Sequence, residues 1–177
     1  MIGVLVSGGG SNLQALIDEG LPVVAVASSR PEARGLDRAH AAGIDAAAFP
    51  LADHATRASR DAAMADWLEQ HGVLLVVCAG FMELLTPAFL RRFPDRIVNV
   101  HPSLLPQFPG TRSIAEAVAA GADATGVTVH LVDEGIDTGP ILAQEEVAVE
   151  PHETLVERIH AVEHRLLPDV VRRLCAP

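Results

Sequence analysis

The hydrophobic positions in the first hundred residues form short continuous runs, and longer segments of mixed polarity separate them. The runs predict strands at 2–6, 23–27, 46–49, 73–78 and 96–100. The mixed segments have helical character and predict helices at 11–19, 32–42 and 57–71. Continuous apolar strands that alternate with helices are typical of a parallel sheet buried on both faces. The pattern therefore predicts an α/β fold with a doubly wound, mostly parallel, Rossmann-like sheet.

The second half of the chain follows a different pattern, in which apolar and polar residues alternate. Alternation runs from Thr125 to Val132 and again from Ile141 to Val149, with a turn-rich connection between them. Two alternating runs joined in this way predict an antiparallel extension of the sheet. Apolar residues at helical spacing from Leu155 to Leu166 predict a closing amphipathic helix, which we expect Pro168 to kink or interrupt. Since no repeat or linker divides the chain, we expect a single domain over residues 1–177.

Composition narrows the classes of partner. With 49% hydrophobic and 20% charged residues, the 177-residue chain is typical of a globular protein. Its formal net charge of −10 and its few aromatic residues argue against a nucleic-acid partner. The apolar runs are too short to cross a membrane, and we expect no signal peptide because strand-like sequence starts directly at Met1. Cys78 and Cys175 form no CxxC pair, which is consistent with a cytoplasmic protein without a membrane partner.

The stretch LVSGGGSNLQAL, residues 5–16, joins the first strand to the first helix through three glycines. It lacks the glycine spacing of a dinucleotide fingerprint, because the sixth position from Gly8 is Leu13, and it lacks the lysine of a P-loop. A tight turn that opens a helix still presents free N–H groups, and Ser11 and Asn12 can cap that helix. The stretch therefore predicts either an anion site or a plain turn capped by Ser11.

The stretch RIVNVHPSLLPQFPG places two polar residues at the end of a strand. Asn99 and His101 share one face because they are two residues apart, and Pro102 ends the strand after them. The carboxyl ends of strands are where open α/β sheets bind ligands. An amide can stabilise an oxyanion and an imidazole can move protons near neutral pH, so we expect chemistry here. The alternative is a loop histidine with a locally bonded asparagine. The peptide bond before Pro106 is a candidate for the cis form.

The stretch DEGIDTGP adds carboxylates in a glycine-rich connection. Asp133, Glu134 and Asp137 lie there, and one of them could orient or charge-tune His101. The alternative is a solvated acidic turn, a common place for such residues.

The closing helix contains the sequence His160-Ala-Val-Glu163-His164, which matches the inverted zinc-peptidase motif. The two histidines are one helical turn apart and could share a metal ion. Glu163 lies near the apolar stripe of this helix, however, and short motif matches have a high false-positive rate. We keep a zinc peptidase only as a remote alternative and expect no metal.

Several stretches together resemble the phosphoribosylglycinamide formyltransferase family. They are VLVSGGGSNLQALID, VVCAGFMELLTPAFL, RIVNVHPSLLPQFPG, GVTVHLVDEGIDTGPIL and VEHRLLP, and they extend over nearly the whole chain. The resemblance implies a formyltransferase fold and transfer of the formyl group of 10-formyltetrahydrofolate to the amine of glycinamide ribonucleotide. Both would bind as small-molecule substrates, with no metal. The GGGSNLQAL element is the most specific, because the middle stretches also occur in other enzymes of 10-formyltetrahydrofolate.

The resemblance also implies roles for individual residues. Asn99, His101 and Asp137 match the family's catalytic residues. The substrate-binding set for glycinamide ribonucleotide would comprise Gly10, Ser11, Asn12, His160 and Glu163. The folate-binding set would comprise Arg60, Met82, Glu83, Leu84, Leu85, Asn99, Asp133 and Glu134. On this basis residues 1–100 form a phosphate- and substrate-binding half, and residues 101–177 form a folate-binding half with the closing helix.

Each folate assignment has a plain alternative. Met82, Leu84 and Leu85 could be ordinary core residues, and Arg60 could be a surface charge. Glu83 stands where relatives often carry a basic residue, which affects folate affinity only if its side chain matters. His130 is interpreted as structural or solvated and is left out of the site.

Four other readings of the function stay open. The chain could be a formyltransferase with another amine acceptor, or a deformylase that uses water. It could be a catalytically silent binding protein, or the zinc peptidase already mentioned. The phosphate loop argues against the first two, and the joint presence of Asn99, His101 and Asp137 argues against a silent binder. We expect a monomer or a homodimer.

Overall fold

The computed structural model describes residues 1–176 and divides into two compact units. The first unit comprises Met1–Val98, and the second begins at Asn99. Within residues 1–176, no helix is both long enough and apolar enough to cross a membrane. The cytoplasmic location and the oligomeric state stay predictions.

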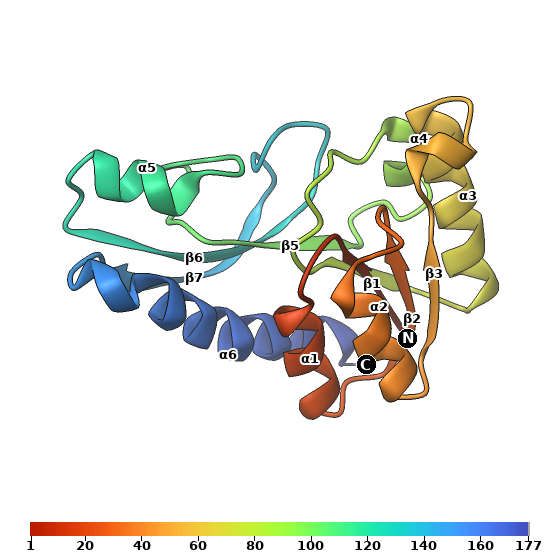
Figure 1. Ribbon diagram of the computed structural model, residues 1–177, viewed down its shortest axis with the longest axis horizontal. Helices are drawn as coiled ribbons and strands as arrows, with labels where there is room; N and C mark the ends of the chain where they lie inside the picture. Colours follow the sequence, from red (N-terminus) through yellow and green to blue (C-terminus); the bar gives the residue numbers. More distant parts are fainter. Residues whose placement is uncertain (177) are drawn as a thin grey trace. The chain divides into compact units, whose positions relative to one another are not determined.

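The first unit alternates strands and helices (Figure 1). Its complete strands are β1 (Ile2–Val6), β2 (Val23–Ser28), β3 (Asp45–Ala48) and β4 (Leu75–Cys78). Its helices are α1 (Ser11–Asp18), α2 (Arg34–Ala41), the 3₁₀ turn η1 (Leu51–Asp53), α3 (Arg57–Gln70) and α4 (Pro87–Leu90). The strands lie in the order β3-β2-β1-β4, with β1 parallel to β2 and β4, and β2 parallel to β3. This arrangement confirms the expected doubly wound, parallel α/β pattern.

Burial on both faces explains why β1 and β4 lack alternation. Every residue of β1 and β4 is buried, so neither face of these strands needs polar side chains. Leu13 and Leu16 of α1 and Met64 and Leu68 of α3 supply fully buried side chains from the helices. At Gly3 a Cβ would lie only 2.9 Å from Leu68, so glycine allows close packing there.

The second unit contains the antiparallel part of the fold. Strand β5 (Ile97–His101) enters it from the first unit, and β6 (Ala124–Leu131) and β7 (Ile141–Ala148) follow. Its helices are α5 (Ser113–Ala119), the 3₁₀ turn η2 (His152–Thr154) and α6 (Leu155–Cys175). The pairing of β6 with β7 is antiparallel, which confirms the predicted extension. Figure 1 shows α6 running along these two strands, which it contacts.

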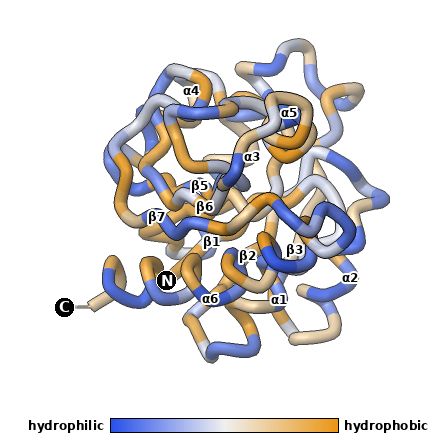
Figure 2. Tube along the Cα trace, turned by 90° about the vertical axis from the view of Figure 1, so that its left-hand side faces the viewer, coloured by the Kyte–Doolittle hydropathy of each residue, from blue (hydrophilic) through white to orange (hydrophobic). Residues whose placement is uncertain are grey.

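The helix α6 corrects one prediction. It continues through Pro168 to Cys175 without interruption. Pro168 is itself buried, as are Leu167 and Val171, so packing of this turn offsets the hydrogen bond that proline removes. In Figure 2 hydrophobic and hydrophilic positions alternate along α6, as the helical spacing of its apolar residues predicted.

Two short helices were not predicted. α4 has one turn, begins with a proline and is too short for a periodic pattern. α5 has seven residues, three of them alanine, so it has no strong apolar stripe to detect. The cis peptide bond expected at Leu105-Pro106 is confirmed, and Glu150-Pro151 is also cis.

Candidate active site

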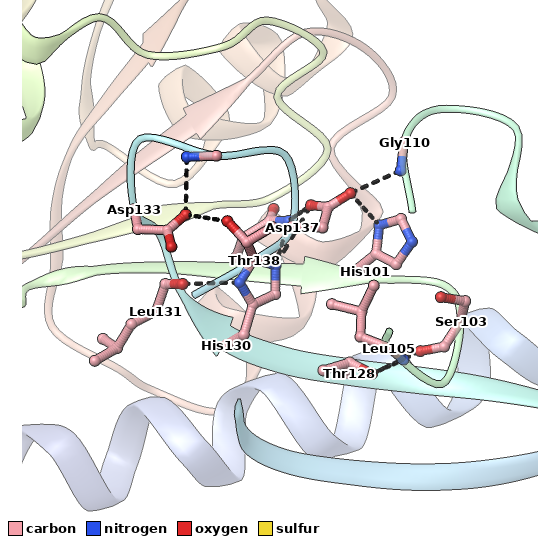
Figure 3. Close-up of polar contacts among 12 residues, drawn as sticks. His101, Ser103, Leu105, Gly110, Thr128, His130, Leu131, Asp133, Asp137 and Thr138 are labelled. Carbon is pink, nitrogen blue, oxygen red and sulfur yellow. Dashed lines mark hydrogen bonds and ion pairs between the residues drawn. The ribbon is translucent and has the colours of Figure 1, made fainter. Parts of the chain in front are cut away.

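Four polar side chains gather in the second unit. Asn99 and His101 come from β5, His130 from β6 and Asp137 from the connection between β6 and β7. The Nδ1 atom of His101 lies 3.4 Å from Oδ2 of Asp137. Oδ1 of the same carboxylate lies 3.4 Å from Nδ2 of Asn99 and 3.5 Å from Nε2 of His130. Figure 3 shows Asp137 between the two imidazole rings.

Both ring nitrogens of His101 face an oxygen atom. Its Nε2 lies 2.9 Å from the carbonyl oxygen of Phe108, so Nε2 acts as a donor. The other ring nitrogen faces the carboxylate of Asp137. A neutral ring would turn a lone pair toward that carboxylate, whereas an imidazolium places an N–H on each acceptor. The ring is 4% exposed, so solvent screens this interaction little.

Asp137 is held in place as an ionised carboxylate. It adopts a left-handed backbone conformation (φ 53°), and its Oδ2 accepts a 2.8 Å hydrogen bond from the Gly110 N–H. Burial by itself would raise its pKa, but hydrogen bonds from His130 and Gly110 and the charges of both histidines outweigh burial. The pKa of Asp137 therefore lies below its ordinary value.

The residue that sequence reasoning missed is His130. It is 2% exposed, which corrects the interpretation of a solvated side chain. Its Nδ1 lies 2.8 Å from the Leu131 carbonyl oxygen and donates to it, and its Nε2 lies 3.5 Å from Oδ1 of Asp137. The same Nε2 lies 3.2 Å from Nδ2 of Asn99, so the ring contacts both the carboxylate and the amide of the cluster. The only available signal was a histidine facing opposite to the apolar positions of its strand.

The loop after β5 is built to carry the contacts of His101. Ser103 Oγ donates to the Gln107 carbonyl, and Thr128 Oγ1 donates to the Ser103 carbonyl, both at 2.6 Å. Thr128 Oγ1 also accepts from the Leu105 N–H at 3.1 Å, and Gln144 donates to the Leu105 carbonyl at 2.8 Å. These bonds hold the backbone that presents Phe108 O and Gly110 N–H. Figure 3 shows Thr128 beside Ser103 and Leu105, and Gly110 beside Asp137.

The other two acidic residues of the connection face solvent. Asp133 is exposed and accepts hydrogen bonds from the Gly135 N–H at 3.0 Å and the Thr138 hydroxyl at 2.7 Å. Glu134 is also exposed. Asp133 therefore shapes the turn that carries Asp137, which is a local structural role in addition to any contact with folate.

The glycine loop lies in the first unit and differs in one detail from expectation. The N-cap of α1 is Gly10, which adopts a left-handed conformation (φ 70°), and no side chain caps the helix. Ser11 is the first helical residue, so the interpretation of a turn capped by Ser11 is wrong. Gly8 and Gly9 are exposed, and Asn12 is buried.

The expected folate residues of the first unit fall into two groups. Arg60 is fully buried, which corrects the alternative of a surface charge, and it pairs with Asp61 at 2.7 Å and with Glu83 at 2.9 Å. Met82 is 56% exposed and Leu84 is 51% exposed, so they are not ordinary core residues, and Leu85 is half-buried.

The ion pair with Arg60 also explains the state of Glu83. Burial would raise the pKa of Glu83, but hydrogen bonds from Arg60 and Ser29 lower it below its ordinary value. Relatives often carry a basic residue at this position. In this chain the carboxylate that stands there binds the guanidinium of Arg60 in α3.

The remaining expected residues lie on α6. Glu163 is 5% exposed, as its place near the apolar stripe indicated, whereas His160 is exposed. The rings of His160 and His164 stack with centroids 6.0 Å apart, and burial together with the charge of His160 lowers the pKa of His164. Within residues 1–176, no group of three histidine, cysteine or acidic side chains could hold a metal ion. The zinc motif therefore receives no support from its surroundings.

The cluster of the second unit has the groups that acyl transfer needs. An amide N–H₂ and an imidazolium can donate hydrogen bonds to an oxyanion, and the imidazole can then exchange a proton. A carboxylate that stays ionised supports the positive ring. His101 is buried and its ring is held by Phe108 and Asp137, so Nε2 would exchange the Phe108 carbonyl for an oxyanion.

Comparisons with known proteins identify the relatives of this chain. Residues 1–171 match the Formyl transferase family. The chain is 48% identical to a phosphoribosylglycinamide formyltransferase of Mycobacterium tuberculosis, over 97% of this chain and 83% of that protein. It is 41% identical to a trifunctional purine biosynthetic protein of Chironomus tentans, of which it spans 13%. The crystal structure of glycinamide ribonucleotide transformylase 1 from Symbiobacterium toebii superposes with a TM-score of 0.93 at 46% identity, over 97% of this chain and 85% of the other.

Proposed function

Because the chain belongs to the phosphoribosylglycinamide formyltransferases of the Formyl transferase family, we propose that it formylates glycinamide ribonucleotide in purine biosynthesis. Membership of this family implies a folate-derived formyl donor, and we propose that the donor is 10-formyltetrahydrofolate. The observation that carries the proposal is the cluster of Asn99, His101 and Asp137, in which Asn99 and His101 each lie 3.4 Å from one oxygen of the Asp137 carboxylate.

In the proposed reaction the acceptor amine attacks the formyl carbon of the donor. A new C–N bond forms, and the carbonyl oxygen becomes an oxyanion in a tetrahedral intermediate. Asn99 and protonated His101 would donate hydrogen bonds to this oxyanion, and Nε2 of His101 would exchange its bond to the Phe108 carbonyl oxygen for this one. The bond from carbon to N10 of the folate then breaks. The amine loses one proton and N10 gains one, so the exchange balances, and His101 is the group suited to assist it.

Asp137 supports this step through its charge. Its carboxylate faces Nδ1 of His101, and hydrogen bonds with Gly110 and His130 keep its pKa low. An ionised Asp137 stabilises the imidazolium of His101 and fixes the orientation of the ring. His130 assists by directing the amide of Asn99, so it acts as a positioning residue.

The glycine loop would bind the phosphate of the acceptor. Gly10, Ser11 and Asn12 open α1, whose first N–H groups have no acceptor inside the helix. These groups and the helix dipole favour an anion. We assign His160 and Glu163 of α6 to the phosphate and ribose of the same substrate, on the basis of the family resemblance.

The formyl donor would be bound by backbone groups and by side chains. The segment Met82, Glu83, Leu84 and Leu85, in which Met82 and Leu84 are exposed, is suited to contact a flat ring with its backbone. Asp133 and Glu134 would lie on the folate side of the second unit. Arg60 is already neutralised by two carboxylates, so we expect its main contribution to be the position of Glu83.

A formyl-transfer assay tests the proposed function. Purified protein is mixed with 10-formyltetrahydrofolate and glycinamide ribonucleotide, and release of the deformylated folate is followed with and without the acceptor. Acceptor-dependent turnover is the expected result. Turnover that is equal without acceptor would instead identify a deformylase. Turnover only with a different amine would identify another formyltransferase, and folate binding without any turnover would identify a silent binder.

A further inference from the structure

The glycine loop is held from one side by α2. The carbonyl oxygen of Gly8 accepts a 3.0 Å hydrogen bond from the Gly35 N–H. The next carbonyl, that of Gly9, accepts a 2.8 Å hydrogen bond from Nε of Arg38. Gly35 and Arg38 both belong to α2. Two successive carbonyls of the loop are therefore turned toward this helix.

This orientation decides where the N–H groups of the loop point. The peptide bonds of the loop are not among the cis bonds of residues 1–176. In a trans peptide the C=O and the N–H point in opposite directions. Since the carbonyls of Gly8 and Gly9 face α2, the N–H groups of Gly9 and Gly10 face away from it. Carbonyl oxygens would repel an anion, so binding them to α2 leaves donors on the open side.

The glycine loop and α2 pack too closely for one to shift along the other. A Cβ on Gly10 would lie 2.7 Å from the Cα of Gly35 and 3.3 Å from Cδ of Arg38. A Cβ on Gly35 would in turn lie 2.8 Å from a methyl group of Val6 in β1. The backbone of the loop therefore packs directly on the backbone of α2. The Arg38 side chain, in contrast, could release the Gly9 carbonyl without any movement of the helix.

Arg38 also contacts the helix that follows the loop. Its Nη1 donates a 3.0 Å hydrogen bond to Oε1 of Gln14, and Nε2 of Gln14 donates to Asp18 at 2.8 Å. The N–H of Gln14 is bonded to the carbonyl of Gly10 at 2.9 Å. One guanidinium thus joins the turn to the first turns of α1. Its planar fork can make both bonds at once, which an ammonium cannot reproduce.

We propose that Arg38 is a positioning residue for the anion loop, and that it sets the affinity of the loop for the phosphate monoester of the acceptor. It acts by binding the Gly9 carbonyl and thereby orienting the N–H groups of the loop, and its charge adds to the attraction in a chain with a net charge of −10. The inference rests on the proposed function, because that function identifies the anion.

The test compares Arg38→Met, Arg38→Lys and the control Arg34→Met. Arg34 is an exposed arginine of the same helix, so its variant removes equal charge without touching the loop. For each protein we measure the KM for glycinamide ribonucleotide, the KM for 10-formyltetrahydrofolate, the inhibition constant of inorganic phosphate and the thermal midpoint. Phosphate binding is also measured directly by calorimetry, without substrates.

We expect Arg38→Met to raise the acceptor KM and the phosphate constant together, by roughly tenfold, or about 1.4 kcal/mol. The donor KM should stay within about twofold, Arg38→Lys should recover only part of the loss, and Arg34→Met should match the wild type. Unchanged phosphate binding in Arg38→Met would overturn the inference. An equal rise in both KM values with a lowered thermal midpoint would also overturn it, because that result indicates a purely structural role.

The two proposals can fail separately. If the wild-type chain shows no acceptor-dependent turnover, the proposed function is wrong. Calorimetry with inorganic phosphate then still decides the role of Arg38, since it requires no reaction. If the wild type is active and Arg38→Met binds phosphate normally, only the inference about Arg38 is wrong.

Discussion

The glycine loop and the His101 cluster are built in opposite ways. The loop consists of consecutive residues, exposes Gly8 and Gly9, and offers mainly backbone N–H groups. The cluster joins side chains that are up to 38 residues apart, and His101 and His130 within it are almost completely buried. The glycine loop can bind through its backbone because its residues have no side chains that obstruct the N–H groups. The His101 cluster depends instead on which partners the fold places beside each ionisable side chain.

This difference teaches where each region is vulnerable. In the cluster, removing one side chain leaves a buried donor or acceptor without its partner and changes the charge of the others. In the loop, a methyl group added at Gly10 is enough to disturb the contact with α2. We therefore expect the cluster to control turnover and the loop to control affinity for the acceptor, and four variants test this division.

The largest effect is expected from His101→Ala. It removes the imidazolium and the proton-transfer group, so kcat should fall roughly a thousandfold, within the range for a general acid–base residue. KM for the acceptor should change little, because the loop is intact. Steady-state kinetics measures both. The control His152→Ala removes an exposed histidine and should keep normal kinetics. A kcat near that of the wild type would exclude His101 from the mechanism.

The next effect is expected from Asp137→Asn, which should lower kcat roughly a hundredfold because the imidazolium loses its counter-charge.

The Asp137→Asn variant also tests how Asp137 contributes to stability at acid pH. Since the folded pKa of Asp137 lies below its ordinary value of 3.8, the carboxylate stabilises the protein above that pH. This contribution disappears as pH falls through the folded pKa. Urea unfolding should therefore show a difference between the two proteins that shrinks below about pH 4. A difference that grows toward acid would contradict the assigned direction.

A smaller effect on activity is expected from Gly10→Ala. The new Cβ would lie 2.7 Å from the Cα of Gly35, and alanine tolerates a φ of 70° poorly. The acceptor KM should rise roughly tenfold, and the free energy of unfolding should fall by about 2–3 kcal/mol. Gly20→Ala is a matched control, because Gly20 has a φ of 65° but no atom within 4 Å of an added Cβ. Equal losses in both variants would show that strain, and not the contact with α2, explains the effect.

The smallest effect is expected from His130→Phe. The phenyl ring fills the buried site but has no ring nitrogen, so the amide of Asn99 and the carboxylate of Asp137 lose the atom that lies 3.2 Å and 3.5 Å away. We expect kcat to fall roughly fivefold, with the acceptor KM unchanged, as suits the loss of a positioning contact. His40→Phe, at an exposed position of α2, serves as the control. A rise in KM without a change in kcat would place His130 in binding instead of positioning.

Much of this fold followed from local pattern. The continuous runs of β1 and β4 predicted buried parallel strands, and the alternation of β6 and β7 predicted an antiparallel pair; the structure has both. The failures have physical reasons. α4 and α5 are too short or too rich in alanine to show periodicity, and Pro168 does not interrupt α6 because the turn around it is packed.

The site was predictable to the extent that its residues are neighbours. Asn99 and His101 could be placed on one face because strand geometry relates positions two residues apart. That Asp137 would approach His101 was only a possibility in the sequence, since nothing local relates the two. His130 was missed for the same reason, because its importance lies in its distances to Asn99 and Asp137.

The sequence by itself determined the order of strands and helices, the glycine turn and the polar strand end, because each depends on contacts between near neighbours. Only the tertiary structure decided which ionisable groups meet. It places two histidines beside Asp137, pairs Arg60 with the carboxylates of Asp61 and Glu83, and bonds Arg38 to the carbonyl of Gly9. These pairings set charge states and donor directions through distances of a few ångströms, and such distances arise only when remote segments of the chain pack together.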